Sequence, residues 1–387
     1  MATSSAIQRG SLAPLSSVTH TTAVVEESRC FSAVARKSKP AKFSNYGHGM
    51  QKLTFSSLLG GGQRSLGQGF RNPEQQEPRK AGSEIVAQAV STRFNRKARR
   101  AENVEGDFFV DHTCIDCDTC RWMAPETFSH LNGQSAVHRQ PQTPDERTRA
   151  LQALLACPTA SIRTETPPKD IKDAQNTFPL AIDPETLPGV YHSGYHSENS
   201  YGATSYFVHR PERGNILIDS PRFTEVLAKR IEQMGGVRYM FLTHQDDVAD
   251  HAKWAARFGC ERIIHEDDVR SSTRDVERKL EGSGPWTLDE EVELIHTPGH
   301  TAGCVSLFYK PHKALFTGDH LAYSRRQEGL SIFRGVNWYS VSKQIDSVRK
   351  LIPLDFLWLL PGHGRRYHFE SEADRREKLE ELVAQES

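Results

Sequence analysis

Four cysteines constrain this chain more than any other feature of its sequence. Cys114, Cys117 and Cys120 follow one another with two residues between neighbours, and Cys157 stands immediately before Pro158. A tight loop with this spacing can place three thiolates around one face of an iron-sulfur cubane, while a distant cysteine closes the fourth corner. The sequence therefore predicts that these four side chains bind one 4Fe-4S cluster.

The segment around these cysteines resembles the single-cluster 4Fe-4S ferredoxins, through the cysteine spacing and the ending CPTASI. In two-cluster bacterial ferredoxins the run continues with a further Cys-Pro, whereas Ala124-Pro125 stands here, so one cluster is expected. Asp116 and Asp118 replace the small residues usual in such loops, and their charge is expected to lower the reduction potential. A four-cysteine zinc site is the alternative, although zinc ligands normally come as two separated Cys-x-x-Cys pairs.

A second constellation begins at FLTHQDDVADH, which runs from Phe241 to His251. It is close to the metal-binding pattern His-x-His-x-Asp-His, but it lacks the second histidine and carries two extra residues. Three later fragments, HTPGHTAG, LFTGDHL and LPGHGRR, each place a His or Asp where an apolar run meets a glycine or a polar turn. Such positions can project side chains from one edge of a sheet into a shared cleft. The candidate metal ligands are His244, Asp246, Asp250, His251, His300, Asp319 and His363.

In order and approximate spacing these motifs resemble the metallo-β-lactamase superfamily across roughly residues 177 to 369. The resemblance implies two neighbouring metal sites that share one carboxylate. In that scheme the first site takes His244 and His300, the second takes Asp250, His251 and His363, and the bridge is Asp319.

The missing histidine leaves one ligand open. Asp246 stands where the His-x-His register would place it, and Asp247 is the neighbouring alternative. Because every other motif is intact, we expect a working site with altered ligands. A carboxylate in place of an imidazole adds a hard oxygen donor, which favours iron or manganese relative to zinc without excluding zinc. Two divalent metals, zinc or iron or manganese, are therefore expected beside the 4Fe-4S cluster.

From Phe178 onward, strand-like and helix-like runs alternate, which is typical of a layered α/β arrangement. Together with the two resemblances this predicts an α+β protein, in which a ferredoxin-like Fe-S domain precedes an αββα metallo-β-lactamase-fold sandwich. The expected segments are a transit peptide with a disordered leader at 1–89, the 4Fe-4S domain at 90–168, the metallo-β-lactamase-like domain at 169–370 and a charged peripheral helix at 371–387.

Composition bounds the remaining choices. The chain has 49 Lys and Arg against 49 Asp and Glu, which argues against a protein that binds nucleic acid over its whole surface. No apolar run is long enough to cross a bilayer, so no membrane span is expected. Residues 1 to 25 contain Ser, Thr, Ala and one Arg without an acid, which is typical of a transit peptide. We therefore expect a chloroplast stromal protein, with the mitochondrion or a disordered N-terminal arm as alternatives. The basic run 93–100 could touch RNA, but we expect a solvated leader helix or a docking arm.

Three functions fit these features. The first is a hydrolase that uses a metal-bound hydroxide, with Asp250 orienting the hydroxide as well as binding metal. The second is an oxidoreductase in which the cluster feeds electrons to a di-iron site, supplied by a donor such as a ferredoxin or a reductase. The third is a redox-sensing regulatory or assembly factor with a residual metal site. We favour the hydrolase acting on a small-molecule substrate, whose identity the fold does not specify.

Overall fold

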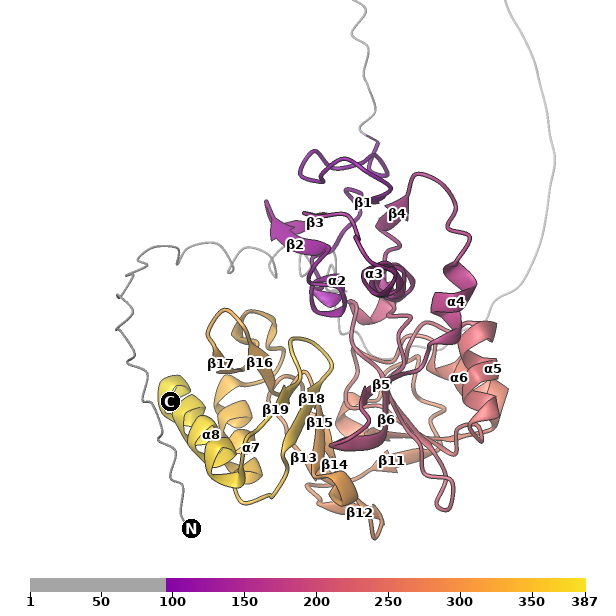
Figure 1. The fold of residues 1–387 in the computed structure, drawn as a ribbon. Coiled ribbons are helices and arrows are strands. Elements are labelled where there is room, and N and C mark those ends of the chain that lie inside the picture. Colours follow the sequence, from indigo (N-terminus) through magenta and orange to yellow (C-terminus); the bar gives the residue numbers. More distant parts are fainter. Residues whose placement is uncertain (1–94) are drawn as a thin grey trace, which may run out of the picture. The chain divides into compact units, whose positions relative to one another are not determined.

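The computed structural model of the protein describes residues 95–387, and Figure 1 shows their arrangement. The transit peptide and leader expected at 1–89 lie outside the described residues. Among the described residues, no helix combines the length and apolar character that crossing a bilayer requires. In chain order the strands and helices are β1 Phe108–Val110, α2 Thr119–Met123, β2 Phe128–Leu131, β3 Gln134–Val137, α3 Pro144–Ala156, β4 Ile162–Thr164, α4 Ile171–Asn176, β5 Leu180–Asp183, β6 Leu187–His192, β7 Tyr206–Val208, β8 Ile216–Ile218, α5 Glu225–Gln233, β9 Tyr239–Phe241, α6 His251–Phe258, β10 Glu261–His265, β11 Arg278–Leu280, β12 Trp286–Asp289, β13 Val292–His296, β14 Val305–Tyr309, β15 Ala314–Gly318, β16 Ala322–Ser324, β17 Gly329–Ser331, α7 Val341–Leu351, β18 Trp358–Pro361, β19 Tyr367–His368 and α8 Glu372–Glu386.

Two sheets packed face to face form the centre of the fold. The first is seven-stranded, in the order β11-β10-β9-β8-β7-β6-β5, and the second is six-stranded, in the order β12-β13-β14-β15-β18-β19. Because side chains alternate along a strand, Ile216 and Ile218 of β8 join the core between the sheets, while Leu217 joins the core on the outer side. In β15, Phe316 faces the inner core and Leu315 the outer one. Both faces of each sheet are therefore covered, which explains why these strands are apolar at successive positions.

Helices cover the outer faces of this sandwich. Helices α5 and α6 contribute Leu227 and Trp254 to the core outside the first sheet, and α7 contributes Val348 to the core outside the second. The first turns of α5 and α7 are capped by Thr224 and Ser340, whose hydroxyls accept backbone N–H groups three residues on. The layers are helix, sheet, sheet and helix, so the αββα arrangement expected from the sequence is confirmed.

The cysteine-rich segment packs onto the first outer layer. Strand β1 pairs antiparallel with β4, β2 pairs with β3, and α2 lies against α3. Side chains of this segment such as Val110 and Leu151 belong to the same apolar cluster as Phe178, Leu217 and Trp254. The cysteine-rich segment and the sandwich thus share one continuous core. The segment benefits from this because it is too small to bury a large core alone.

The end of the basic run does not form the solvated helix expected from the sequence. The backbone of Arg99 forms an isolated β-bridge with that of Asp111. Its guanidinium donates to Glu165 Oε1 and to the Gly106 carbonyl, each at 2.6 Å. Arg100 is 2% exposed, and its guanidinium donates to backbone carbonyls of the β2-β3 hairpin. These two arginines donate to backbone carbonyls of the cysteine-rich segment, and Arg99 also pairs with Glu165, so they hold this segment together.

The C-terminal helix α8 is also less peripheral than expected. Its Leu379 and Leu382 are buried in the core outside the second sheet, beside α7. Arg375 is 3% exposed and donates to the carbonyls of Phe356 and Ile352. The many charges of this helix lie on its outer face, and they conceal a short apolar stripe that completes the fourth layer.

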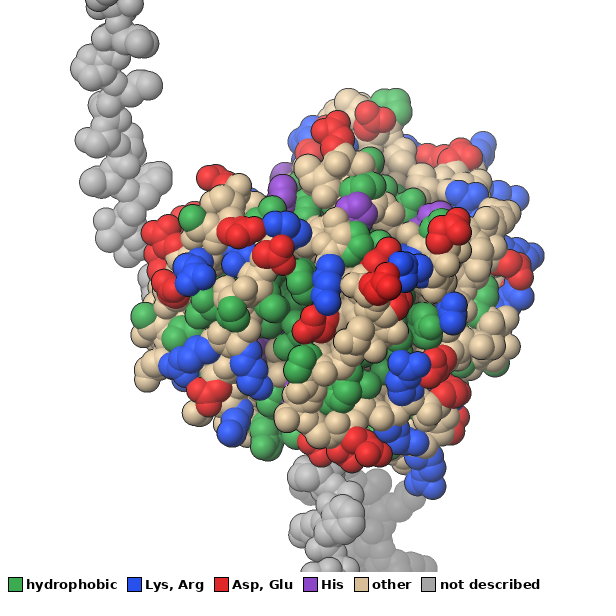
Figure 2. Space-filling model, turned by 90° about the horizontal axis from the view of Figure 1, so that it is seen from below, with side chains coloured by type: hydrophobic (Ala, Val, Ile, Leu, Met, Phe, Trp, Pro, Cys, Tyr) green, Lys and Arg blue, Asp and Glu red, His purple; other side chains and the backbone are tan. Residues whose placement is uncertain are grey.

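Surface charge is mixed on the face drawn in Figure 2, where basic and acidic side chains are interspersed. This face presents no broad field of one sign, in keeping with the balance of 49 cations and 49 anions in the sequence.

Truncation of Leu379 tests whether α8 is part of the fold. Leu379→Ala should lower the free energy of unfolding by about 2 to 4 kcal/mol, because it removes a fully buried side chain and leaves a cavity. The exposed Glu381 on the same helix is the matched control, and Glu381→Ala should change it by less than about 0.5 kcal/mol. Urea unfolding of both variants measures the difference, and equal stability would show that α8 is dispensable.

Candidate cluster site and metal centre

The four cysteines come together at one end of the cysteine-rich segment. Cys114 and Cys117 lie in the loop before α2, Cys120 lies in α2, and Cys157 caps the C-terminus of α3. All four line one cavity with Ser135. The structure thus places the four predicted cluster ligands around a common space.

The loop between these cysteines needs two unusual backbone conformations. Asp116 and Asp118 adopt φ values of 59° and 66°, in the left-handed region that favours glycine. Both carboxylates pair with Arg121, and Asp118 also binds Arg365 at 2.6 Å. These aspartates therefore stand where related loops carry glycine, and the arginines offset the negative charge that was expected to lower the potential.

The cysteine environment fits an iron-sulfur cluster. Burial, reinforced by the neighbouring Cys157, raises the pKa of the Cys117 thiol to about 12. Buried thiols with raised pKa values lose their protons only when a cation compensates the charge of the thiolates, as iron does. Backbone N–H groups of Asp116 and Ser161 approach Cys114 Sγ and Cys157 Sγ at 3.4 and 3.3 Å, which is the kind of contact that stabilises cluster thiolates.

A second group of polar side chains gathers at the carboxyl ends of four strands. His244, Asp246 and Asp247 follow β9, and the other three residues follow β13, β15 and β18. These three are His300, Asp319 and His363. These strands belong to the two packed sheets and end at the same edge of the sandwich, so the loops that follow them bring together residues 119 positions apart.

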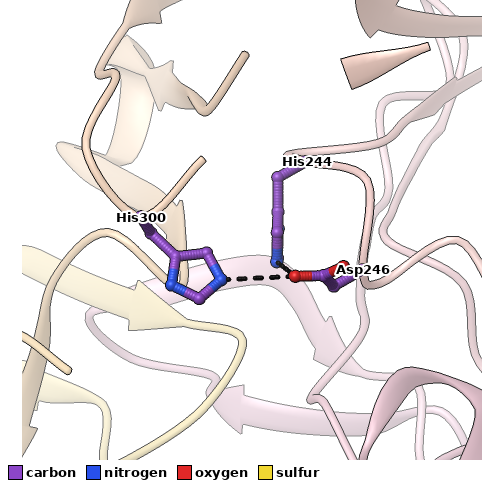
Figure 3. A group of neighbouring side chains, drawn as sticks. All are labelled: His244, Asp246 and His300. Carbon is purple, nitrogen blue, oxygen red and sulfur yellow. Dashed lines mark ion pairs between the residues drawn. The ribbon is translucent and has the colours of Figure 1, made fainter. Parts of the chain in front are cut away.

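His244, Asp246 and His300 form the first subsite, shown in Figure 3. The Nε2 atoms of His300 and His244 lie 3.5 and 3.9 Å from Asp246 Oδ2. The same two nitrogens lie 3.7 and 3.8 Å from Asp319 Oδ2. Two ligand atoms bound at tetrahedral angles to one metal are separated by about 3.4 Å, so this spacing suits a single cation among the four groups.

The second subsite lies on the other side of Asp319. Asp247 and Asp319 form a further potential ligand group with His244. His363 Nδ1 lies 2.7 Å from Asp319 Oδ1. A Cβ atom added to Gly362 would lie 2.8 Å from Asp247 Oδ2 and 3.1 Å from Asp319 Oδ1, so both oxygens converge beside this glycine. Asp319 thus directs one oxygen to each subsite, as a bridging carboxylate does.

The polar atoms of this group fit metal binding because several are buried without another use. His244 Nε2, both ring nitrogens of His300 and both carboxylate oxygens of Asp247 find no hydrogen-bond partner within residues 95–387. Burial raises the pKa of Asp247 well above its usual range, and the charge of Asp319 adds to this. Burial also acts to raise the pKa of Asp319, but His363, His244 and His300 lower it overall. A cation at this place would satisfy atoms whose burial is otherwise costly.

Asp250 and His251 are not brought into this group, although the sequence motif suggested both. The Asp250 carboxylate accepts from Phe223 N at 2.8 Å and pairs with Lys253 at 2.9 Å. His251 Nε2 lies 3.1 Å from the Ser272 carbonyl, and its Nδ1 lies 3.1 Å from Arg262. Both residues begin α6, whose packing directs them toward neighbouring elements instead. The structure therefore does not bring Asp250 and His251 to this group, and the carboxylate that lies beside Asp319 is that of Asp247.

Two buried carboxylates that sequence reasoning missed position the ligand loops. Asp219, which follows β8, accepts from Thr243 N at 2.8 Å and Thr243 Oγ1 at 3.0 Å. The same hydroxyl lies 3.0 Å from His244 Nδ1, so it orients the imidazole, and burial raises the pKa of Asp219 to about 7. Asp268 accepts from Gln245 N and Gly303 N and so joins the loops of His244 and His300. An acid directly after an apolar run was the available signal for Asp219.

Two family models match separate parts of the chain. Residues 110–164 match the family model of the 4Fe-4S single cluster domain of Ferredoxin I, and residues 201–363 match that of the Metallo-beta-lactamase superfamily. Both resemblances drawn from the motifs are thereby confirmed. A hydroxyacylglutathione hydrolase of Mesorhizobium japonicum is 35% identical over 119 residues, which are 30% of this chain and 46% of that protein. The chain thus spans about half the length of the curated relatives it matches.

Solved structures are similar at lower identity. The BLEG-1 B3 metallo-beta-lactamase aligns with a TM-score of 0.36 at 19% identity, covering 46% of this chain and 91% of that one. The protein ETHE1 from Myxococcus xanthus aligns with a TM-score of 0.36 at 18% identity, covering 49% of this chain and 83% of that one.

Replacement of one cysteine tests the cluster site. Cys157→Ser should lose most of the cluster iron and its visible absorbance, because one corner of the cubane loses its thiolate. Cys260 is also buried but lies outside the cavity, so Cys260→Ser makes the same change elsewhere and should retain the iron. Iron analysis after anaerobic reconstitution compares the two. Full iron content in Cys157→Ser, or zinc in place of iron in the unaltered protein, would contradict the assignment.

A pair of aspartates tests the corrected metal ligands. Asp247→Asn should lower the metal content of the second subsite by on the order of half or more, because an amide lacks the charge that holds a divalent cation. Asp250→Asn should leave the metal content unchanged, since its carboxylate contacts Phe223 N and Lys253. Elemental analysis of both proteins at equal concentration decides between them. The opposite pattern would restore the ligand assignment suggested by the sequence motif.

Proposed function

We propose that the protein is a metal-dependent hydrolase of acyl thioesters. The observation that carries the proposal is the group of three imidazoles and three carboxylates at the strand ends, with buried atoms that suit two neighbouring cations. The relatives named hydroxyacylglutathione hydrolase, whose name describes hydrolysis of a glutathione thioester, support the substrate class. The residues that would hold the metals are His244, Asp246, Asp247, His300, Asp319 and His363.

Two metals in such a site supply a hydroxide at neutral pH and polarise the carbonyl that it attacks. The chain itself fixes the geometry of that chemistry. Asp319 holds the two subsites together, and the hydrogen-bonded pair of Asp219 and Thr243 fixes the ring of His244. Asp247 takes the orienting role expected of Asp250, because its oxygens have no other partner within the described chain and Asp250 is bound elsewhere.

Exposed aromatic side chains flank the ligand loops and supply a surface for the acyl group. The Trp338 side chain is 55% exposed, and the backbone N–H of this residue donates to the His300 carbonyl at 2.8 Å. Tyr201 is 47% exposed, and its carbonyl accepts from His363 Nε2 at 3.3 Å. Because each backbone is tied to a candidate metal ligand, each ring stays near the metal centre while presenting apolar area to a substrate.

Activity measurements on purified protein test the proposal. Protein loaded with zinc, manganese or iron should hydrolyse an S-acyl glutathione or a related thioester faster than a lactone or a phosphodiester. Asp319→Asn should reduce kcat/KM by on the order of a hundredfold or more, since it loses the shared carboxylate. A chelator should abolish the activity, and added metal should restore it.

The variant Trp338→Ala serves as the control for substrate binding. It should raise KM with little change in kcat, because the ring contacts the substrate and not the metals. Hydrolysis that survives Asp319→Asn and chelation would contradict the metal centre. A preference for phosphodiesters over thioesters would contradict the substrate class.

A further inference from the structure

One loop of the first sheet contacts both the cluster site and the metal centre. This linking segment, residues 196–204, lies between β6 and β7. It contacts the cysteine loop on one side and the loop of His363 on the other. No motif marks this segment in the sequence. Neither cluster binding nor metal-dependent hydrolysis requires that it contact both sites.

On the cluster side, the linking segment touches the ligand Cys117. Thr119 Oγ1 lies 3.4 Å from Cys117 Sγ and 3.1 Å from His196 Nδ1, which in turn lies 2.8 Å from the Gly202 carbonyl. A Cβ atom on Gly202 would lie 2.8 Å from Cys117 Cβ and 3.4 Å from its sulfur. Gly202 also adopts φ +88°, so the absence of a side chain allows its backbone to lie directly against the cluster ligand.

On the metal side, the preceding residue touches a candidate metal ligand. The Tyr201 carbonyl accepts a hydrogen bond from His363 Nε2 at 3.3 Å. His363 Nδ1 lies 2.7 Å from Asp319, the carboxylate shared by the two subsites. Thr204 N donates to the Gly362 carbonyl at 2.7 Å and fixes the two loops together. One peptide group, between Tyr201 and Gly202, therefore separates the contact with Cys117 from the contact with His363.

Such proximity matters for electrons because electron transfer between protein-bound centres falls steeply with distance and with gaps in packing. The route from Cys117 through the Tyr201–Gly202 peptide to His363 is made of covalent bonds and close contacts. The outer part of the cysteine loop, residues 112–118, is partly exposed, so a donor protein can approach the cluster site from this side.

The ligands of the metal centre suit a redox-active metal. Three carboxylates among six candidate ligands favour iron or manganese, because hard oxygen donors select these ions more than thiolate or imidazole sets do. Iron at this centre could then accept an electron, whereas zinc could not.

We propose that the cluster and the metal centre form an electron-transfer pair, with the Tyr201–Gly202 peptide lying between Cys117 and His363. A low-potential one-electron donor reduces the cluster by one electron. The cluster then returns to its oxidised form as one ferric ion at the metal centre becomes ferrous. One electron leaves and one arrives, and no bond is made or broken. This activity goes beyond hydrolysis, which needs no electrons.

Electron paramagnetic resonance of the whole protein tests the pair. Protein with a reconstituted cluster is loaded at the metal centre with either zinc or ferric iron-57. Half a molar equivalent of dithionite, which supplies one electron per protein, is then added anaerobically. The signal of the reduced cluster should persist in the zinc-loaded protein. It should disappear in the iron-loaded protein as Mössbauer spectra show ferrous iron-57. A cluster signal that persists equally with both metals, or failure of iron to bind at the centre, would overturn the proposal.

A glycine variant tests the route. Gly202→Ala should slow iron-57 reduction at least tenfold in freeze-quench experiments, because its Cβ would force Cys117 and the linking segment apart. Gly282→Ala is the matched control, since Gly282 has φ +78° and no atom within 4 Å of an added Cβ, so it carries the backbone strain without the clash. Equal rates in the two variants would rule out this route.

The zinc and iron comparison stands even where Gly202→Ala loses a cofactor, because it uses the unaltered sequence. Thioester hydrolysis by the zinc-loaded protein does not depend on electron transfer. Failure of one proposal is therefore distinguishable from failure of the other.

Discussion

The gathering of three carboxylates and three imidazoles, four of them buried, at one edge of the sandwich is the constraint on which the site depends. Aspartates and histidines without hydrogen-bond partners are costly inside a protein, and the chain accepts that cost at the ends of β9, β13, β15 and β18. The burial of apolar side chains on both faces of each sheet offsets this free-energy cost. The rigid strands fix where the loops begin, and the buried acids Asp219 and Asp268 fix how two of those loops are oriented. The polar centre thus rests on an apolar scaffold that leaves its ligands little freedom.

The cysteine-rich segment is not an independent attachment to this scaffold. Its apolar side chains enter the same core as the first sheet and its helices. Asp118 in the cysteine loop binds Arg365, and Trp122 in α2 lies under the guanidinium of Arg366 at 4.5 Å. Both arginines follow His363 within three residues in the chain. The residues that shape one cofactor site are therefore neighbours, in sequence or in space, of residues that shape the other.

Sequence reasoning predicted the parts of the site that depend on strand ends and on cysteine spacing. His300, Asp319 and His363 each follow an apolar run, so the sheet brings them to one edge whatever the loops between them do. It did not fix the arrangement of the turn after β9, where four acids or histidines follow His244 within seven residues. Spacing alone does not tell which of them faces inward, because that depends on where α6 begins and on partners such as Arg262 and Phe223 N. Helix α8 and Arg100 were misjudged for a related reason, since charged residues concealed their buried contacts.

The salt bridge between Arg365 and Asp118 links the two sites. Any ligand that binds only the folded state stabilises that state, and two ligands that favour the same arrangement assist each other equally. Asp118 lies between two of the cluster-site cysteines, and its partner Arg365 lies two residues after His363. A cluster bound at the cysteines would therefore favour the arrangement in which His363 faces Asp319, and a metal bound there would favour the cysteine loop by the same free energy.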